Sequence, residues 1–521
     1  MMLQDDIAQS THAGERLRTI VLLWPRGNYF VGYLFVFAIA AFLRILLSLV
    51  NREGNDNHYE VVKLILEGRS RLTMADCHEC FHPKLYYYVC AAVVRALALT
   101  DESSRIVAGQ LLNSIAGLIT LGLVFFSLNA SRFHAKWRFW TFALIALNPR
   151  FIAINGQFSN DSFAILLATA AIFLTLRLLQ APSLWLCVGT QLMLTCALMT
   201  KGTTWVVAIA MLMIFLVRAS LDESKQHSRW FAGLYILTVL NGFASIQLAG
   251  YDFEHYDVYA NMGRGQPLHV WEKTSVGRPG VQSIVDGYLT FRIMDLVRDP
   301  QITNGKAIEQ QHRTSVWTQL YARANFAQFE QHPKSWLTND PNVLLIAKCS
   351  LVLGLLPLVF LLVGLARGSL RSTRQLWLWV GLKKIEPEAL ADNGSRASET
   401  RSVGSASASG SSKSDFSSGQ SSGVPQQSNF ASLFSLLVCL GYIAFIIKFT
   451  ADYRDFAAMK LIYMLPGVLP LALSLLEGMQ TVTERLSHVK FVDRMVHCLL
   501  LCLVILHVAG IVALVKQLAE Q

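Results

Sequence analysis

The chain has 521 residues, of which 53% are hydrophobic and 15% are charged, and its formal net charge is +10 at pH 7. Apolar runs long enough to cross roughly 30 Å of bilayer hydrocarbon recur along its whole length, which excludes a soluble domain and predicts an all-α polytopic membrane protein. The basic residues collect in short loops between apolar runs, as in cytoplasmic loops, so the charge implies no nucleic-acid partner.

The N-terminal residues 1–28 are polar and place Arg16, Arg18 and Arg26 ahead of the first apolar run. Because no small-residue cleavage site follows, we expect a cytoplasmic tail and an uncleaved first membrane helix rather than a removable signal peptide. Apolar windows predict eleven membrane helices, at about 30–50, 105–128, 139–154, 162–179, 183–200, 203–218, 231–250, 342–366, 431–449, 457–476 and 496–516.

A twelfth apolar run, at about 85–99, is short of the roughly 20 residues that a membrane span needs and contains Arg95. If this run does not span, every strongly basic short loop falls on the cytoplasmic side; if it spans, the later loops invert and the charge rule fails repeatedly. We therefore predict a juxtamembrane or re-entrant helix here. The external side then receives residues 51–104, 155–161, 200–202 and 251–341.

This topology predicts a simple organisation of the chain. Residues 385–428 are rich in Ser, Gly, Ala and Gln with few apolar residues, which predicts a disordered cytoplasmic linker. The other predicted units are an N-terminal membrane module at 29–250 with its external loop at 51–104, a second external loop at 251–341, a membrane helix at 342–366 and C-terminal membrane helices at 429–521.

Two acidic residues are expected on the external side. Asp56 follows the first predicted helix, and Asp161 follows Asn160 in a polar corner between two predicted helices. Each can be a solvated loop or cap residue, or a carboxylate that takes a proton from a hydroxyl group at a partly desolvated membrane face. The presence of two such acids on one side favours a shared external cavity.

Basic and aromatic residues are expected on the same side. The segment His82-Pro83-Lys84 precedes a tyrosine run that includes Tyr86. Pro83 disfavours helix at His82, so we expect a helix to begin there with amide donors facing an anion. An interfacial aromatic belt with a snorkelling lysine is the alternative interpretation.

Lys201 separates two apolar runs that would otherwise join, and it is flanked by Thr200 and Gly202. The lysine can snorkel at a helix end, but a compact ammonium beside exposed backbone donors is also suited to a phosphoester held at the membrane face. We favour the phosphate site.

Cys77 and Cys80 lie three residues apart in the predicted external loop, with histidines nearby. The spacing permits a zinc site, but a second Cys or His pair is missing. A local disulfide on an oxidising face and two free thiols are the other possibilities, and we favour the disulfide.

The order of these motifs resembles that of a known family. It runs from Asp56 through His82-Pro83-x-Leu85-Tyr86, Asn160-Asp161 and Met199-Thr200-Lys201-Gly202 to Lys460-Leu461-Ile462-Tyr463-Met464-Leu465-Pro466. This order resembles the GT-C superfamily of membrane glycosyltransferases, in particular the family 39 type, which includes protein O-mannosyltransferases and bacterial aminoarabinose transferases. The resemblance covers residues 30–218 and 450–476.

The resemblance implies transfer of a sugar, with inversion, from a polyprenyl-phosphate donor to a protein, lipid or glycan acceptor on the external or lumenal face. It implies that Asp56 is the general base, Asp161 the second external acid and Lys201 a ligand of the donor phosphate. His82 stands where family members have His or Lys, which implies a role at the leaving phosphate.

Further residues complete the expected site. Lys84 and Lys460 are assigned to the donor phosphate, and Asn160, Tyr86 and Arg313 to substrate binding. The first motif reads Asn55-Asp56-Asn57 instead of the Asp-Glu pair of the mannosyltransferases. Mannose and a metal-bridged acid pair are therefore not implied, and no cofactor is assigned, although a divalent metal stays open.

Other interpretations remain at this stage. The aromatic and basic segment 311–323 can cover the cavity or anchor the loop at the membrane interface. A transporter or flippase of lipid-linked or small polar substrates is the alternative function, but it would favour paired repeats and broken helices near the midplane, which the sequence does not show. The serine-rich insertion favours an endoplasmic reticulum membrane over a bacterial inner membrane.

Overall fold

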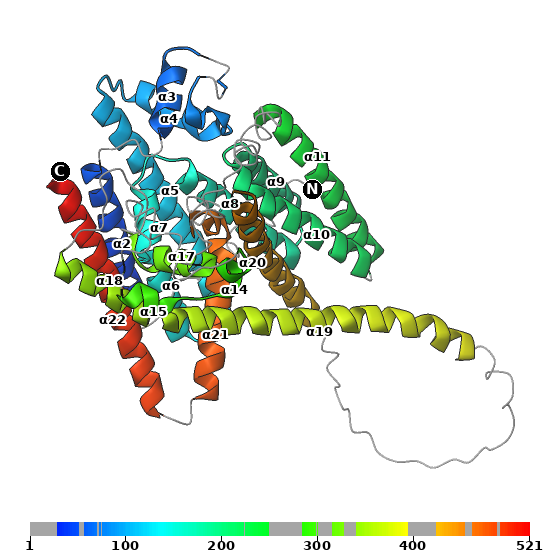
Figure 1. The fold of residues 1–521 in the computed structure, drawn as a ribbon. Helices are drawn as coiled ribbons and strands as arrows, with labels where there is room; N and C mark the ends of the chain where they lie inside the picture. Colours follow the sequence, from blue (N-terminus) through cyan, green and yellow to red (C-terminus); the bar gives the residue numbers. More distant parts are fainter. Residues whose placement is uncertain are drawn as a thin grey trace, which may run out of the picture.

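The computed structural model describes residues 29–51, 57–69, 72–73, 76–222, 224–249, 284–298, 300, 315–327, 340–393, 424–453, 461–486 and 490–520. Within these ranges every regular element is a helix, and the helices form one bundle with a smaller group of helices at one end (Figure 1). The expected all-α membrane fold is confirmed.

The helices follow one another in chain order. The first half contains α2 (Phe30–Val50), α3 (His58–Leu66), the 3₁₀ turn η1 (His78–Phe81), α4 (Leu85–Ala96), α5 (Glu102–Ala130), α6 (Ala135–Ala146), α7 (Pro149–Asn155), α8 (Asp161–Gln180), α9 (Leu184–Leu198), η2 (Gly202–Thr204), α10 (Trp205–Leu221) and α11 (Lys225–Ala249). The second half contains α14 (Ile284–Leu289), α15 (Ile293–Arg298), α17 (Val316–Asn325), α18 (Pro341–Leu353), α19 (Leu355–Asn393), α20 (Val424–Tyr453), η6 (Leu461–Tyr463), η7 (Leu465–Gly467), α21 (Val468–Arg485) and α22 (Lys490–Ala519).

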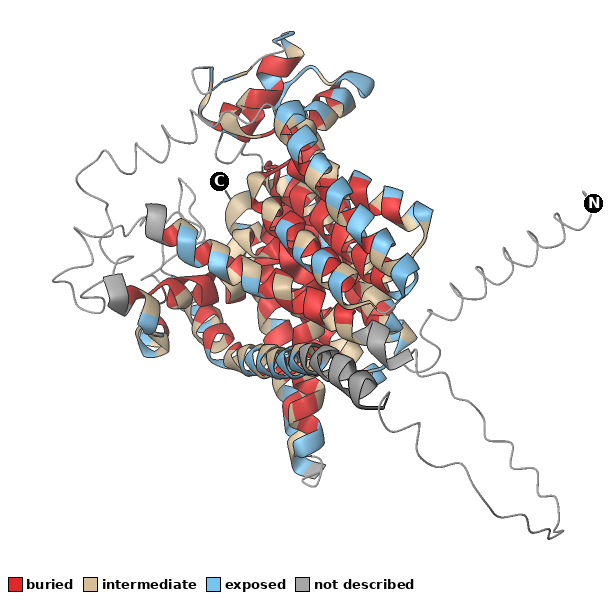
Figure 2. Cartoon of the chain, turned by 90° about the vertical axis from the view of Figure 1, so that its right-hand side faces the viewer, coloured by how far each residue is buried: buried red, intermediate tan, exposed pale blue. Residues whose placement is uncertain are grey.

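The surface of the bundle is suited to lipid. Buried positions lie mainly between the helices, whereas exposed positions alternate with less exposed ones along the outer faces (Figure 2). Large apolar side chains stand on these outer faces, among them Phe35, Trp185 and Phe243, which are 65%, 80% and 66% exposed. Because water would penalise so much exposed apolar surface, the chain is a multi-pass integral membrane protein.

Nine helices in the described part of the chain are long and apolar enough to cross a membrane, compared with the eleven expected. Two expected spans account for the difference. The run at 183–200 forms α9, whose 15 residues extend only about 22 Å at 1.5 Å per residue. The run at 139–154 is divided into α6 and α7.

The division of the 139–154 run has a local cause. Pro149 lacks an amide proton and occupies the first turn of α7, where no amide partner is needed. The side chain of Asn148 caps α7 by accepting a hydrogen bond from the Phe151 amide at 3.0 Å. The expectation of one continuous helix is therefore wrong, because hydropathy alone does not register a proline preceded by a capping residue.

The break leaves backbone carbonyls at the end of α6 that need donors, and a buried arginine supplies one. Arg44, in α2, donates from Nη1 to the Ala146 carbonyl at 3.0 Å and from Nε to Asn155 Oδ1 at 2.8 Å. Its guanidinium also lies 5.0 Å from the centre of the Phe151 ring. The first membrane helix therefore ties both halves of the broken helix together.

The predicted juxtamembrane helix corresponds to α4, whose 12 residues extend only about 18 Å. It packs with α3 as a cap over one end of the bundle (Figure 1). This cap has its own small core, to which Tyr59, Val62, Tyr87 and Cys90 contribute. The Arg95 guanidinium donates to the Ile65 carbonyl at 3.2 Å. The charged residue that argued against a membrane span here therefore forms a hydrogen bond within the cap.

The predicted linker is partly helical at its two ends. Residues 385–393 continue α19 and residues 424–428 begin α20, whereas residues 394–423 lie outside the described part of the chain. Residues 385–393 include Glu, Ala and Leu, which are strong helix formers, so this segment can be helical without an apolar face to pack against other helices.

Helix α19 runs across the bundle and crosses α21 at a pair of glycines (Figure 1). A Cβ atom added at Gly364 would overlap the Ser474 carbonyl, and one added at Gly478 would overlap the Phe360 carbonyl. The two helices thus meet backbone to backbone, an approach that small residues allow in membranes.

We predict that Gly364→Ala lowers the melting temperature of the purified protein, because the new methyl group forces α19 and α21 apart at a cost of about 1–3 kcal/mol. Gly368→Ala is the matched control, since it lies on the same helix with nothing within 4 Å of the added Cβ. The control is expected to be neutral or slightly stabilising. Equal melting temperatures for the two variants would contradict the backbone contact.

Candidate functional site

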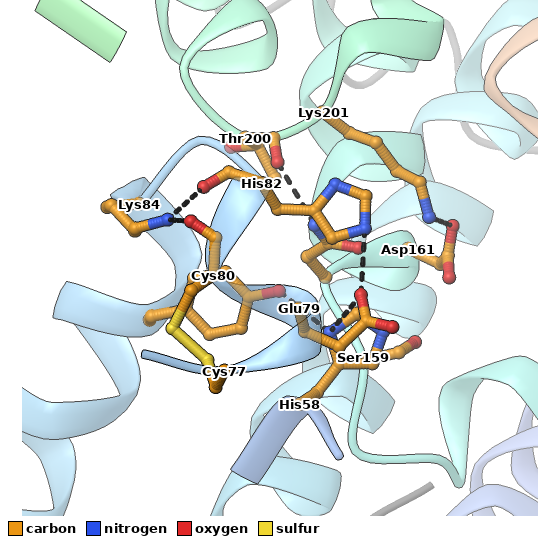
Figure 3. Close-up of polar contacts among 12 residues, drawn as sticks. His58, Cys77, Glu79, Cys80, His82, Lys84, Ser159, Asp161, Thr200 and Lys201 are labelled. Carbon is orange, nitrogen blue, oxygen red and sulfur yellow. Dashed lines mark hydrogen bonds and ion pairs between the residues drawn. A yellow bond between two sulfur atoms is a disulfide. The ribbon is translucent and has the colours of Figure 1, made fainter. Parts of the chain in front are cut away.

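Three of the four predicted external segments meet where the cap adjoins the bundle. They contribute His58, Glu79 and His82 from the cap, Asp161 from the start of α8 and Lys201 from the turn before η2 (Figure 3). All of these side chains are at least nine-tenths buried except that of His82, which is 13% exposed. A cluster of buried ionisable groups at one end of a membrane bundle is the strongest candidate for a functional site.

An ion pair joins the two corners of the bundle that carry Asp161 and Lys201, which are the start of α8 and the turn before η2. Lys201 Nζ donates to Asp161 Oδ1, and the two residues are 8% and 7% exposed. The Lys201 ammonium also lies 5.9 Å from the centre of the Tyr463 ring, which belongs to η6. An ammonium has three donors, so pairing with Asp161 leaves it able to bind another anion.

Backbone and amide contacts hold these corners in register. Asn160 is fully buried and donates from Nδ2 to the Thr200 carbonyl at 3.2 Å. The Leu85 amide, at the start of α4, donates to the Met199 carbonyl at 3.1 Å. This second bond uses an amide that was expected to face an anion, and it anchors the cap on the corner that carries Lys201.

The cap contributes a carboxylate flanked by two imidazoles. Glu79 Oε2 lies 3.0 Å from His82 Nε2 and 3.8 Å from His58 Nδ1. The two histidine rings are stacked with their centres 5.7 Å apart. His58 and Glu79 were not expected at the site, although the position of Glu79 between two cysteines and just ahead of His82-Pro83 is a signal in the sequence.

The two histidines differ in their surroundings. Burial lowers the pKa of His58 to about 4, while the nearby Glu79 carboxylate raises it only in part. His58 is therefore neutral near pH 7, and its Nδ1 shares a hydrogen bond with the Tyr87 hydroxyl at 2.7 Å. Of the two rings beside Glu79, that of His82 is the closer to the carboxylate and the more exposed, at 13%.

Cys77 and Cys80 form a disulfide that closes the four-residue turn containing Glu79. Lys84 binds the same turn, donating from Nζ to the carbonyls of Cys80 and His82, the second at 2.6 Å. Burial lowers the pKa of Lys84 to about 8. Figure 3 shows its ammonium directed at these two carbonyls, so Lys84 stabilises the turn in this structure, and its assignment to the donor phosphate stays a prediction.

Other expected residues have different places. Tyr86 is fully buried, and its hydroxyl accepts a hydrogen bond from Asn113 Nδ2 at 3.1 Å, so it lies in the core between the cap and α5, and its assignment to substrate binding stays a prediction. In the segment expected to cover the cavity or anchor at the interface, Arg323 is fully buried in α17 and cannot act as an interfacial anchor.

Three expected site residues, Asp56, Arg313 and Lys460, lie outside the described part of the chain. Within the described part, no group of three or more His, Cys, Asp or Glu side chains is arranged to hold a metal ion.

Comparisons with known proteins agree with the order of the motifs. Residues 82–246 match the family described as dolichyl-phosphate-mannose-protein mannosyltransferase. This match agrees with the resemblance to the protein O-mannosyltransferases over that part of the chain. This mannosyltransferase-like segment, residues 82–246, includes His82, Asp161 and Lys201 but not Glu79 or His58. No curated protein is significantly similar to the chain in sequence.

Solved structures show a distant likeness. The archaeal oligosaccharyltransferase AglB from Archaeoglobus fulgidus, in complex with an inhibitory peptide and a dolichol-phosphate, aligns with a TM-score of 0.46 and 12% identity over 94% of this chain and 56% of that chain. ArnT from Cupriavidus metallidurans, bound to undecaprenyl phosphate, aligns with a TM-score of 0.33 and 12% identity over 87% of this chain and 78% of that chain. The chain thus spans little more than half the length of AglB. Because identities and TM-scores are low, neither structure assigns a role to any residue here.

We predict that acid weakens the fold through His58. Its pKa falls from 6.5 to about 4 on folding, so the unfolded chain binds the proton first as the pH drops through this window, and up to about 3 kcal/mol of stability is lost. His58→Gln keeps a hydrogen-bonding side chain near Tyr87 but does not titrate. Melting curves at pH 7 and pH 4.5 should show a smaller acid-induced drop for this variant than for the wild type; equal drops would contradict the assignment.

Proposed function

We propose that the chain is a membrane glycosyltransferase that moves a sugar from a polyprenyl-phosphate donor to an acceptor at the end of the bundle covered by the cap. The observation that carries the proposal is the buried Asp161–Lys201 pair next to His82, within the mannosyltransferase-like segment. Buried cations are costly at a membrane face, and an anionic ligand that enters from the bilayer offsets this cost. The proposed location is the external or lumenal face of an endoplasmic reticulum membrane.

The proposed reaction is a displacement at the anomeric carbon. The acceptor oxygen forms a bond to this carbon while the bond between the carbon and the phosphate oxygen breaks, and the lipid phosphate leaves with the electron pair. Lys201 and a protonated His82 stabilise the leaving phosphate, because fixed cations act strongly where water is excluded. A carboxylate takes the acceptor proton; Asp56 is the proposed base, and Asp161 holds Lys201 in place.

A second feature supports a lipid-linked donor. A mostly apolar cavity is lined by residues of α6, α7, α17, α19 and α21, by His507 of α22 and by Leu461 of η6. The same short turn carries Tyr463, whose ring lies beside Lys201. One 3₁₀ turn therefore connects an apolar cavity to a cationic site, an arrangement suited to a ligand with a long hydrocarbon tail and a phosphate head.

We predict that Lys201→Met reduces sugar transfer from polyprenyl-phosphate donors by about a hundredfold or more, since one fixed charge at a transition state is worth roughly 3–4 kcal/mol. The purified protein is incubated with a panel of polyprenyl-phosphate sugars, and the released lipid phosphate and the glycosylated product are measured.

Two controls accompany this assay. Lys136→Met removes a partly exposed lysine that is paired with Asp493 at 2.7 Å, and it should transfer like the wild type. The double variant Asp161→Asn/Lys201→Met removes both buried charges, so it should retain folding better than Lys201→Met alone while remaining inactive. Full activity of a folded Lys201→Met protein would overturn the proposed role of Lys201, and absence of transfer by the wild type would overturn the function.

A further inference from the structure

We infer that Glu79 is a positioning residue that fixes His82 toward the donor phosphate, and that the Cys77–Cys80 disulfide fixes Glu79. This inference rests on the proposed function. It assigns a role to a carboxylate that lies outside the mannosyltransferase-like segment.

The geometry places Glu79 closer to His82 than to His58. Glu79 Oε2 is 3.0 Å from His82 Nε2, which is hydrogen-bonding distance, but 3.8 Å from His58 Nδ1. His58 is instead bonded to the Tyr87 hydroxyl. The Glu79 side chain is only 9% exposed, so little solvent weakens its interaction with the imidazole.

A carboxylate that accepts from one ring nitrogen sets both the orientation and the proton position of an imidazole, and it stabilises the imidazolium. Because Glu79 Oε2 faces His82 Nε2 at 3.0 Å, the inferred role places the ring's proton on this nitrogen. Figure 3 shows the His82 ring next to the Asp161–Lys201 pair, on the side of Glu79 that faces the bundle. The Glu79–His82 contact thus presents a second cation beside Lys201, where the leaving phosphate is proposed to lie.

The turn that carries Glu79 has little freedom. The disulfide joins Cys77 to Cys80, and the Cys80 amide donates to the Cys77 carbonyl at 3.1 Å. The His82 amide donates to the Glu79 carbonyl at 3.2 Å, and Lys84 bonds to the same turn from outside. These contacts fix the backbone at both ends of the Glu79–His82 pair.

A double-mutant cycle with His82→Lys tests the inference. A lysine carries its own charge and has no tautomer to fix, so it does not need Glu79. We expect Glu79→Ala to lower kcat/KM for the lipid donor by about tenfold or more in the wild-type background, mainly through kcat. In the His82→Lys background the same change should alter kcat/KM by less than about twofold.

Glu79→Gln is the conservative variant in this cycle. Its amide oxygen can still accept from His82 Nε2 but carries no charge, so a loss as large as that of Glu79→Ala assigns the effect to charge, and recovery of activity assigns it to orientation. Either result supports a positioning role. The double variant Cys77→Ser/Cys80→Ser should reproduce the loss and add nothing further in the Glu79→Ala background.

Several results would overturn the inference without touching the proposed function. Wild-type activity in Glu79→Ala, while Lys201→Met is inactive, would remove Glu79 from the mechanism. Equal losses in the His82 and His82→Lys backgrounds would make Glu79 a structural residue of the cap. If the wild type transfers no sugar, the proposed function fails, and the same cycle is then measured as binding of undecaprenyl phosphate and dolichyl phosphate. Additive effects on that binding would overturn the inference as well.

Discussion

The ion pair between Asp161 and Lys201 is the contact on which the arrangement of the cap end depends. Each residue lies at a corner between two helices, and each charge would be costly to bury alone, so removing one partner from such a pair typically costs about 3–5 kcal/mol. Asn160 adds a hydrogen bond between the same two corners. The Met199 carbonyl accepts a hydrogen bond from the Leu85 amide at the start of α4, which belongs to the cap. The pair therefore sets the distance between α8 and η2 and, through the second corner, the position of the cap.

The fold could be predicted from the sequence where hydropathy alone decides. Long apolar runs such as 30–50 and 203–218 became helices because hydrocarbon requires every backbone group to bond within its own segment. The 85–99 run was correctly placed outside the set of spans, since its length and Arg95 both oppose crossing. The 139–154 run was not, because its average hydropathy hides the break that Asn148 and Pro149 introduce.

The candidate site could be predicted where a charged residue interrupts apolar sequence. Lys201 and Asp161 were found because each stands at the end of an apolar run, and assignment of both to one side of the membrane brought them near His82. Glu79 and His58 were missed because their significance lies in the distance between their side chains, which sequence spacing does not give. The burial of Tyr86 could not be predicted, because an aromatic residue near a membrane surface has the same sequence pattern whether it faces substrate or the core of the cap.

Arg44 has a consequence for the synthesis of the protein. It lies within the first membrane helix, yet the groups that it binds on α6 and α7 come 102 and 111 residues later in the chain. An arginine near the centre of a membrane helix costs about 2.5–3.5 kcal/mol on insertion, and at about 5–20 residues per second the ribosome needs on the order of 10 s to deliver those partners. During that interval the Arg44 guanidinium needs another partner, such as water, lipid headgroups or the insertion machinery. Arg44 leaves that partner when α6 and α7 are inserted and supply its final hydrogen-bond acceptors.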